Sequence, residues 1–398
     1  MPDIRCRKLA TLRDFYALMA ETAVVRRALA ADVLDGRAAD PDAVQSLRNA
    51  LACLEDVPVH SGRRVLALDA ERTIGLDMDY EIDEARKDVF YLEEGESAFL
   101  DFLGDIHPGF DDYVAAGREL LAGLDLGCLV TDRDGTVNNY CARYLTSVQS
   151  VYNAVFLTRF ARSRVKRPVI LTSAPLDGLV QISVAPEGTF FYAASKGREC
   201  LDLEGRVRRL PIPADKQRAL DALNARLAEL VARPVYEKFS LIGSGLQFKF
   251  GQSTVARQDI GGSVPESESL AFLDLLRGMV AEEDPEARTF RMEDTGLDVE
   301  IILTVESREE GLKDFDKGDG VRFLNDELDL GLFRGAHLVC GDTGSDVPML
   351  EAAMEMSAQA RAIYVTQKEE LARRVTGVTA NALIVPEPDM LVAILGAG

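Results

Sequence analysis

The feature that most restricts the fold of this chain is a short apolar segment followed at once by clustered acidic residues, and it occurs twice. Residues 127–131 (GCLVT) lead into 132–136 (DRDGT), and residues 337–340 (HLVC) lead into 341–346 (GDTGSD). A short, wholly apolar segment is typical of a strand buried on both faces, as in a parallel sheet. Open α/β sheets bind their ligands at the carboxyl ends of such strands. The two segments therefore predict strands of one α/β sheet, with a binding site where they end.

Helical and strand-like segments alternate around both acidic segments. The pattern predicts helices near 143–163, 318–328, 347–355, 367–375 and 388–395, and strands at 168–173, 361–365 and 382–385. Alternation of strand and helix favours parallel strand pairing. We therefore expect an α/β protein whose core, a doubly wound, Rossmann-like parallel sheet, is formed by residues 121–177 and 311–398.

The segment between these two parts, residues 178–310, has a different pattern. It contains strand-like segments at 189–193, 206–210, 235–241, 246–250, 288–292 and 297–304, and amphipathic helices near 213–232 and 266–282. Short strands joined by short turns favour antiparallel pairing. We therefore expect an inserted α+β domain.

Residues 1–120 predict a mostly helical N-terminal extension. The helices are expected at 8–36, 41–54, 95–104 and 110–123, with short strands at 64–69 and 88–92. No residue pattern in it indicates a chemical role, so it is interpreted as a dimerisation domain, a regulatory domain or the remnant of a fused enzyme. We keep self-association through this extension as one expectation.

The charge of the chain excludes some partners. Asp and Glu number 66 and Lys and Arg 45, a net charge of −21, which argues against binding to nucleic acid or to an anionic membrane surface. A small phosphorylated substrate stays possible if a bound cation contacts the phosphate.

The sequence also predicts where the protein is located. It has six scattered cysteines, no signal-peptide pattern and no apolar membrane-spanning segment, so we expect a cytoplasmic protein.

The acidic residues themselves indicate a metal site. Asp132 and Asp134 lie two positions apart at a predicted strand end, and Asp342 and Asp346 lie four apart at another. Carboxylates this close repel one another unless a cation or a shared proton lies between them. Oxygen ligands of this kind suit Mg²⁺. If no ligand binds there, the same residues fit ordinary turns and helix caps.

Two further positions are candidates for binding phosphate. Thr172 and Ser173 end the predicted strand at 168–173, and Lys317 precedes a predicted helix. Hydroxyl groups and a lysine ammonium can bind phosphoryl oxygens. Taken singly, each also fits an ordinary loop hydroxyl or a solvated lysine.

In order, D-x-D-G-T, Thr, Lys-Gly and G-D-x₃-D resemble the four motifs of the haloacid-dehalogenase superfamily of phosphatases. The resemblance implies that Asp132 attacks phosphorus and that Asp134 acts as general acid and base. It implies Mg²⁺ held by Asp132, by the Asp134 main-chain carbonyl and by Asp342, with Asp346 orienting the metal's waters. Thr172, Ser173 and Lys317 would bind phosphate. Residues 178–310 would be the substrate-specificity cap.

Further segments are similar to those of trehalose-6-phosphate phosphatases: 192–199 (YAASKGRE), 237–241 (EKFSL), 247–249 (QFK) and 316–318 (DKG). Candidate sugar contacts in them are Lys196, Arg198, Glu199, Lys238, Ser240, Gln247 and Lys249. The chain departs from that family where Arg133 replaces an aromatic or apolar residue, and where the second motif reads Thr172-Ser173-Ala174 in place of Ser-Gly-Arg.

The function expected is therefore Mg²⁺-dependent hydrolysis of a sugar phosphate, foremost trehalose 6-phosphate, through an aspartyl-phosphate. Phosphatases of sucrose phosphate, mannosyl-3-phosphoglycerate or glucosylglycerol phosphate are alternatives within this class. A sugar phosphomutase and a non-catalytic phosphate-binding regulator are alternatives outside it.

Overall fold

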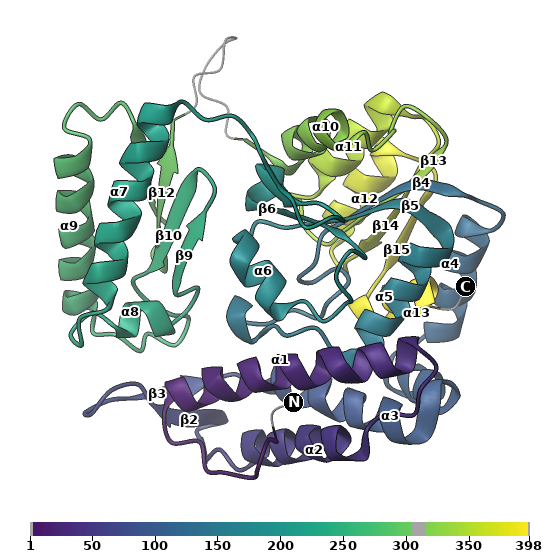
Figure 1. The fold of residues 1–398 in the computed structure, drawn as a ribbon, viewed down its shortest axis with the longest axis horizontal. Coiled ribbons are helices and arrows are strands. Elements are labelled where there is room, and N and C mark those ends of the chain that lie inside the picture. Colours follow the sequence, from purple (N-terminus) through teal and green to yellow (C-terminus); the bar gives the residue numbers. More distant parts are fainter. Residues whose placement is uncertain (1–2, 305–314, 397–398) are drawn as a thin grey trace.

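The computed structural model describes residues 3–304 and 315–396. Figure 1 shows an α/β core, an inserted unit beside it and an N-terminal helical unit that lies along both. No helix in these residues is long and apolar enough to cross a membrane.

The core is an eight-stranded sheet in the order β15-β14-β13-β4-β5-β6-β7-β8. Its strands are β4 (Leu126–Thr131), β5 (Val165–Leu171), β6 (Phe191–Ala194), β7 (Glu199–Leu201), β8 (Val207–Arg209), β13 (Ala336–Gly341), β14 (Ala360–Val365) and β15 (Ala382–Val385). Pairing is parallel from β15 to β6 and antiparallel from there to β8. The parallel α/β sheet predicted from the sequence is confirmed. Because β4 and β13 are adjacent, both acidic segments leave the same edge of the sheet.

Helices cover both faces of this sheet. They are α5 (Val151–Arg164), α6 (Leu176–Ile182), α10 (Lys317–Leu328), α11 (Val347–Met356), α12 (Glu369–Val378) and α13 (Pro388–Gly396). Alternate residues of β4 enter different apolar clusters: Leu129 packs with residues of α5 and α13, whereas Val130 packs with residues of α10 and α11. A strand buried on both faces needs no polar alternation, which is why the sequence of β4 is mostly apolar.

The inserted unit has its own four-stranded antiparallel sheet, ordered β11-β12-β10-β9. Its elements are α7 (Ala214–Val231), α8 (Lys238–Leu241), β9 (Leu246–Lys249), β10 (Gln252–Ala256), α9 (Glu266–Glu283), β11 (Phe290–Asp294) and β12 (Asp298–Leu303). The strand predicted at 235–241 is wrong: this segment contains the helical turn α8. Its Phe239 ring stacks on Phe272 of α9, with ring centroids 3.7 Å apart.

The boundary expected at residue 178 also needs correction. Strands predicted at 189–193 and 206–210 correspond to β6 and β8, which pair within the core sheet. Parallel pairing of β6 with β5, with Ile170 opposite Tyr192, extends the core by three strands before the chain leaves it. The separate antiparallel sheet is therefore built from later residues.

The N-terminal unit contains α1 (Leu12–Leu34), α2 (Pro41–Glu55), a three-stranded sheet of β1 (Val59–His60), β2 (Arg63–Ala67) and β3 (Thr73–Leu76), then α3 (Asp79–Ile106) and α4 (Phe110–Leu121). A capping box between Thr11 and Asp14 begins α1. The strand predicted at 88–92 is wrong, because these residues lie inside α3. Asp88 and Tyr91 are buried one helical turn apart and face the core.

Candidate active site

The two acidic loops meet because β4 and β13 pair in register. The main-chain N–H of Asp132 donates to the Cys340 carbonyl at 3.0 Å, which extends the pairing of the strands into the loops. Gly135 then turns the chain with a φ of 83°, in the left-handed region that glycine tolerates. A Cβ atom there would lie 2.4 Å from Asp342 Oδ2. Glycine at this position thus lets the first loop approach the Asp342 carboxylate.

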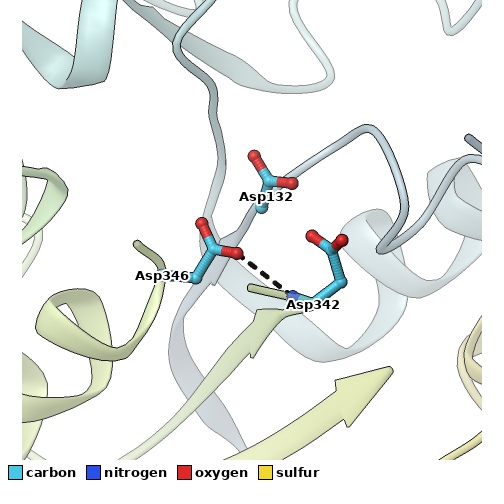
Figure 2. A group of neighbouring side chains, drawn as sticks. All are labelled: Asp132, Asp342 and Asp346. Carbon is cyan, nitrogen blue, oxygen red and sulfur yellow. Dashed lines mark hydrogen bonds between the residues drawn. The ribbon is translucent and has the colours of Figure 1, made fainter. Parts of the chain in front are cut away.

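Three carboxylates gather at this edge of the sheet. Asp132, Asp342 and Asp346 each offer one oxygen, and the three oxygens lie within 4.8 Å of one another (Figure 2). Asp346 Oδ2 accepts hydrogen bonds from the N–H groups of Asp342 at 3.1 Å and Thr343 at 2.9 Å. The Thr136 hydroxyl donates to Asp342 at 3.0 Å and lies 3.3 Å from Asp132. Thr136 was not predicted as a site residue, although it lies within the first acidic motif.

A buried lysine lies against this cluster. Lys317 Nζ donates to Asp132 Oδ1 at 2.6 Å and to Asp346 Oδ1 at 2.5 Å. It is the first residue of α10, and the preceding Asp316 caps this helix in a capping box with Asp319. A Cβ atom at Gly320 would lie 2.1 Å from the Lys196 carbonyl oxygen. The glycine therefore allows the start of α10 to pack against the 195–197 turn.

The single positive charge of Lys317 does not neutralise the negative charges of three carboxylates. Burial raises the pKa of Asp132 to about 6, against the opposing effect of Lys317. Burial and the nearby Asp132 carboxylate raise the pKa of Asp342 to about 8. Burial also acts on Asp346, but Lys317 outweighs it and the pKa of Asp346 is lowered. Three clustered carboxylates, two of them with raised pKa values, offer only oxygen donors and fit a hard divalent cation.

Asp134 lies beside this cluster and has different partners. Its Oδ1 pairs with the Arg133 guanidinium and accepts a hydrogen bond from Ser147 Oγ at 2.7 Å. Its side chain is not one of the three clustered carboxylates. The metal role expected for Asp134 involves only its main-chain carbonyl, and that role stays a prediction.

Thr172 and Ser173 follow β5, the strand next to β4. Thr172 is buried, and its hydroxyl accepts a hydrogen bond from the N–H of Ala174 at 3.3 Å. Its carbonyl accepts from the N–H of Lys196 at 2.9 Å. Ser173 is partly exposed. The loop after β5 thus leaves the same edge of the sheet as the acidic loops.

The structure separates the candidate sugar contacts into two groups. Lys196 and Arg198 lie in the turn between β6 and β7 of the core, and Glu199 begins β7. Glu199 and Lys249 both line a cavity of about 450 Å³ between the core and the inserted unit. Arg209 and Asn224 also line this cavity, and neither was predicted from the sequence.

The remaining candidates do not line this cavity. Lys238 pairs with Glu268, which also accepts a hydrogen bond from Arg72 of the N-terminal unit at 2.7 Å. The Ser240 hydroxyl donates to the Glu237 carbonyl at 2.7 Å. The Gln247 side chain donates to the Ser244 carbonyl at 2.9 Å. These three side chains thus have partners near them in the inserted unit.

Two family models and several known proteins are similar to this chain. Residues 129–391 match the family model "Trehalose-6-phosphate phosphatase, C-terminal", and residues 11–105 match "Trehalose-6-phosphate phosphatase N-terminal helical bundle domain". An alpha,alpha-trehalose-phosphate synthase (UDP-forming) 1 of Caenorhabditis elegans is 34% identical over 395 residues, 92% of this chain and 29% of that protein. A trehalose-phosphatase of the same organism is 26% identical, over 94% of this chain and 91% of that protein.

Among solved structures, the C-terminal domain of a Candida albicans trehalose-6-phosphate phosphatase aligns with a TM-score of 0.44 and 12% identity, covering 72% of this chain and 95% of that one. The chain spans about a third of the length of the synthase relatives it matches. The parallel sheet and the carboxylates at its edge define an α/β protein with an acidic site where its strands end, as the sequence motifs implied. The chain belongs to the trehalose-6-phosphate phosphatase family.

Proposed function

We propose that this protein hydrolyses the phosphomonoester of a sugar phosphate, foremost trehalose 6-phosphate, in a Mg²⁺-dependent reaction at Asp132. The observation that carries the proposal is the buried group of Asp132, Asp342 and Asp346 with Lys317 hydrogen-bonded to two of them. Family membership and the trehalose-phosphatase relatives support the choice of substrate.

Asp132 is the proposed nucleophile. It lies at the end of β4 with its main chain fixed by the hydrogen bond to Cys340. Its carboxylate oxygen forms a bond to phosphorus while the bond from phosphorus to the sugar oxygen breaks, which gives an aspartyl-phosphate and the free sugar. Lys317 donates hydrogen bonds at the same place, where it can neutralise phosphoryl oxygens. Thr172 and Ser173 supply hydroxyl groups from the neighbouring loop.

Asp134 is the proposed proton carrier. It gives its proton to the leaving sugar oxygen, which would otherwise depart as a poor alkoxide leaving group. It then accepts a proton from the water that attacks phosphorus, which releases inorganic phosphate and regenerates the Asp132 carboxylate. Its side chain is partly exposed, which suits contact with both substrate and water.

Asp132, Asp342 and the main-chain carbonyl of Asp134 would hold Mg²⁺, with Asp346 next to them. When bound, the ion supplies positive charge that offsets the repulsion between a carboxylate nucleophile and a phosphate dianion. The donor set supports this ion because it consists of carboxylates and lacks thiolate or imidazole groups among the described residues.

The inserted unit is proposed as the cap that binds the sugar. Glu199 and Arg209 from the core, and Lys249 and Asn224 from the inserted unit, surround the cavity between the two units. Carboxylate, amide and cationic groups suit the hydroxyl groups of a disaccharide. The roles expected for Lys196, Arg198, Lys238, Ser240 and Gln247 stay predictions. Location in the cytoplasm and self-association through the N-terminal unit also stay predictions.

The test is phosphate release from a panel of sugar phosphates, with and without EDTA. We expect the highest kcat/KM for trehalose 6-phosphate, and loss of the activity in EDTA. A higher kcat/KM for sucrose phosphate, mannosyl-3-phosphoglycerate or glucosylglycerol phosphate would change the proposed substrate but not the proposed reaction. Transfer of phosphate between sugars would indicate a mutase, and absence of turnover would indicate a binding protein.

A further inference from the structure

Arg133 is the residue at which this chain departs from its family's first motif, and the structure gives it specific partners. Its side chain is 4% exposed. Nη1 donates to Ser147 Oγ at 2.5 Å and to Asp134 Oδ1, and Nη2 donates to the Ser147 carbonyl. Its own carbonyl accepts from the N–H groups of Val137 at 3.1 Å and Asn138 at 2.9 Å. Arg133 is thus fixed at both its main chain and its guanidinium group.

Ser147 completes a triangle with Arg133 and Asp134. Its hydroxyl accepts from Arg133 and donates to Asp134 Oδ1 at 2.7 Å. Among the described residues, both hydrogen-bond donors to the Asp134 carboxylate act on Oδ1. This arrangement fixes the plane of the carboxylate and leaves Oδ2 as the oxygen that can exchange a proton with substrate or water.

The segment that carries Ser147 is held from outside the core by α1 and α3. Thr146 Oγ1 donates to Glu81 at 2.5 Å, and the N–H of Val151 donates to Asp88 at 2.6 Å. The Val148 carbonyl accepts from the Tyr80 hydroxyl at 2.9 Å and from Arg26 at 3.2 Å.

Tyr80 also reaches the first acidic loop itself. Its hydroxyl lies 2.9 Å from the Asn138 side-chain nitrogen, in a hydrogen bond, and that nitrogen lies 3.5 Å from Ser147 Oγ. The contacts of Ser147 therefore continue, through buried polar groups, into the N-terminal helical unit.

We propose that Arg133 and Ser147 are positioning residues that orient Asp134 for proton transfer, and that the N-terminal helical unit holds Ser147 in place. This inference rests on the proposed function, because it assigns a role in the proton transfer of that reaction. It gives the N-terminal unit a part in the chemistry, although none of its residues belongs to the carboxylate cluster.

The test uses the leaving group. A misplaced general acid slows loss of a sugar alkoxide far more than loss of p-nitrophenolate, which needs little protonation. We expect Arg133→Met to lower kcat/KM for trehalose 6-phosphate about 100-fold and for p-nitrophenyl phosphate less than about 3-fold. Ser147→Ala, which keeps the arginine, should show the same selective loss at about 10-fold, and Arg133→Lys should recover part of it.

Matched variants separate positioning from folding. Arg257→Met removes another buried arginine, paired with Asp294 in the inserted unit, and should change both substrates equally or not at all. On α3, Tyr80→Phe should lower kcat/KM selectively for the sugar phosphate, whereas Tyr91→Phe should not. Melting temperatures of all variants are measured alongside, because a merely structural role would lower both activities together.

The outcomes distinguish the inference from the proposed function. Asp134→Asn serves as the reference, since it should show the largest selective loss. If Asp134→Asn shows the selective loss but Arg133→Met and Ser147→Ala affect both substrates equally, the inference is overturned and the proposed function stands. If the wild-type protein releases no phosphate from any sugar phosphate, the proposed function fails first, and the inference fails with it.

Discussion

Replacing Asp342 by asparagine should stabilise the metal-free protein, although it removes a residue of the proposed active site. The carboxyl is one of three in a cluster with a single lysine, and its pKa is raised from 3.8 to about 8 by burial and by Asp132. Asparagine keeps the shape and still accepts the hydrogen bond that the Thr136 hydroxyl donates to this side chain. It removes the charge that is unfavourable at this position.

The size of the effect follows from the pKa. A shift of one pKa unit corresponds to about 1.4 kcal/mol in the free energy of unfolding. The whole shift of the Asp342 pKa would therefore correspond to about 5 kcal/mol near pH 7.5. Asp342 is partly exposed, and solvent screening reduces this to about 1–2 kcal/mol. The folded state binds the proton more tightly than the unfolded chain, so metal-free stability falls as the pH rises from about 4 to about 8. That fall should be smaller in Asp342→Asn.

The assay is urea unfolding of both proteins in EDTA and in excess Mg²⁺. A ligand at about 100 times its dissociation constant stabilises the folded state by about 2.7 kcal/mol. We expect the variant to be the more stable protein in EDTA and the wild type to be the more stable in Mg²⁺. Asp101→Asn, an exposed change on α3, is the control. A variant less stable than the wild type in EDTA, or equal stabilisation of both by Mg²⁺, would refute the reasoning.

Three other substitutions test separate parts of the structure. Gly135→Ala puts a methyl group 2.4 Å from Asp342 Oδ2 at a φ of 83°, so Mg²⁺ affinity measured by calorimetry should fall at least about 10-fold, and unchanged affinity would contradict the close approach. Arg26→Met removes the ion-pair partner of the fully buried Asp88 and should lower the free energy of unfolding by about 3–5 kcal/mol in urea; a loss below about 1 kcal/mol would show that their 2.7 Å ion pair is unimportant. Lys317→Met should reduce phosphate release at least about 100-fold while the far-ultraviolet circular dichroism is retained, and near-normal turnover would remove this lysine from the mechanism.

Much of the core could be predicted from the sequence, because its strands are buried on both faces. The segments that became β4 and β13 are mostly apolar and are followed by turn-forming residues, which indicates both their type and their ends. Parallel strands of one sheet end at the same edge, so Asp132, Asp342 and Asp346 could be expected to meet there. The structure brings these three together with Lys317.

Short segments of mixed pattern could not be predicted, because tertiary contacts decide their form. Residues 235–241 contain apolar and aromatic side chains that suit either a strand or a helical turn. Stacking of Phe239 on Phe272, 33 positions later in the chain, accompanies the helical form. In the same way, residues 88–92 continue α3, whose Asp88 pairs with Arg26 of α1.

Partners distant in the sequence limited the prediction of the site. Lys238, whose contact with sugar stays a prediction, pairs with Glu268, 30 positions away, and no spacing rule indicates this ion pair. Arg133 was visible in the sequence as a departure from the family motif, which was the signal for its proposed role. Its partner Ser147 lies in a segment that is hydrogen-bonded to the N-terminal unit, and no local sequence pattern marks it.

The most direct test of the central claim is the rate of phosphate release from trehalose 6-phosphate by the wild type and by Asp132→Asn, each in Mg²⁺ and in EDTA. Asparagine keeps the size of the side chain but is a far weaker nucleophile. We predict turnover only by the wild type in Mg²⁺, with substrate binding by the variant retained in calorimetry. Turnover by Asp132→Asn, or wild-type turnover that persists in EDTA, would contradict a metal-dependent reaction at this carboxylate.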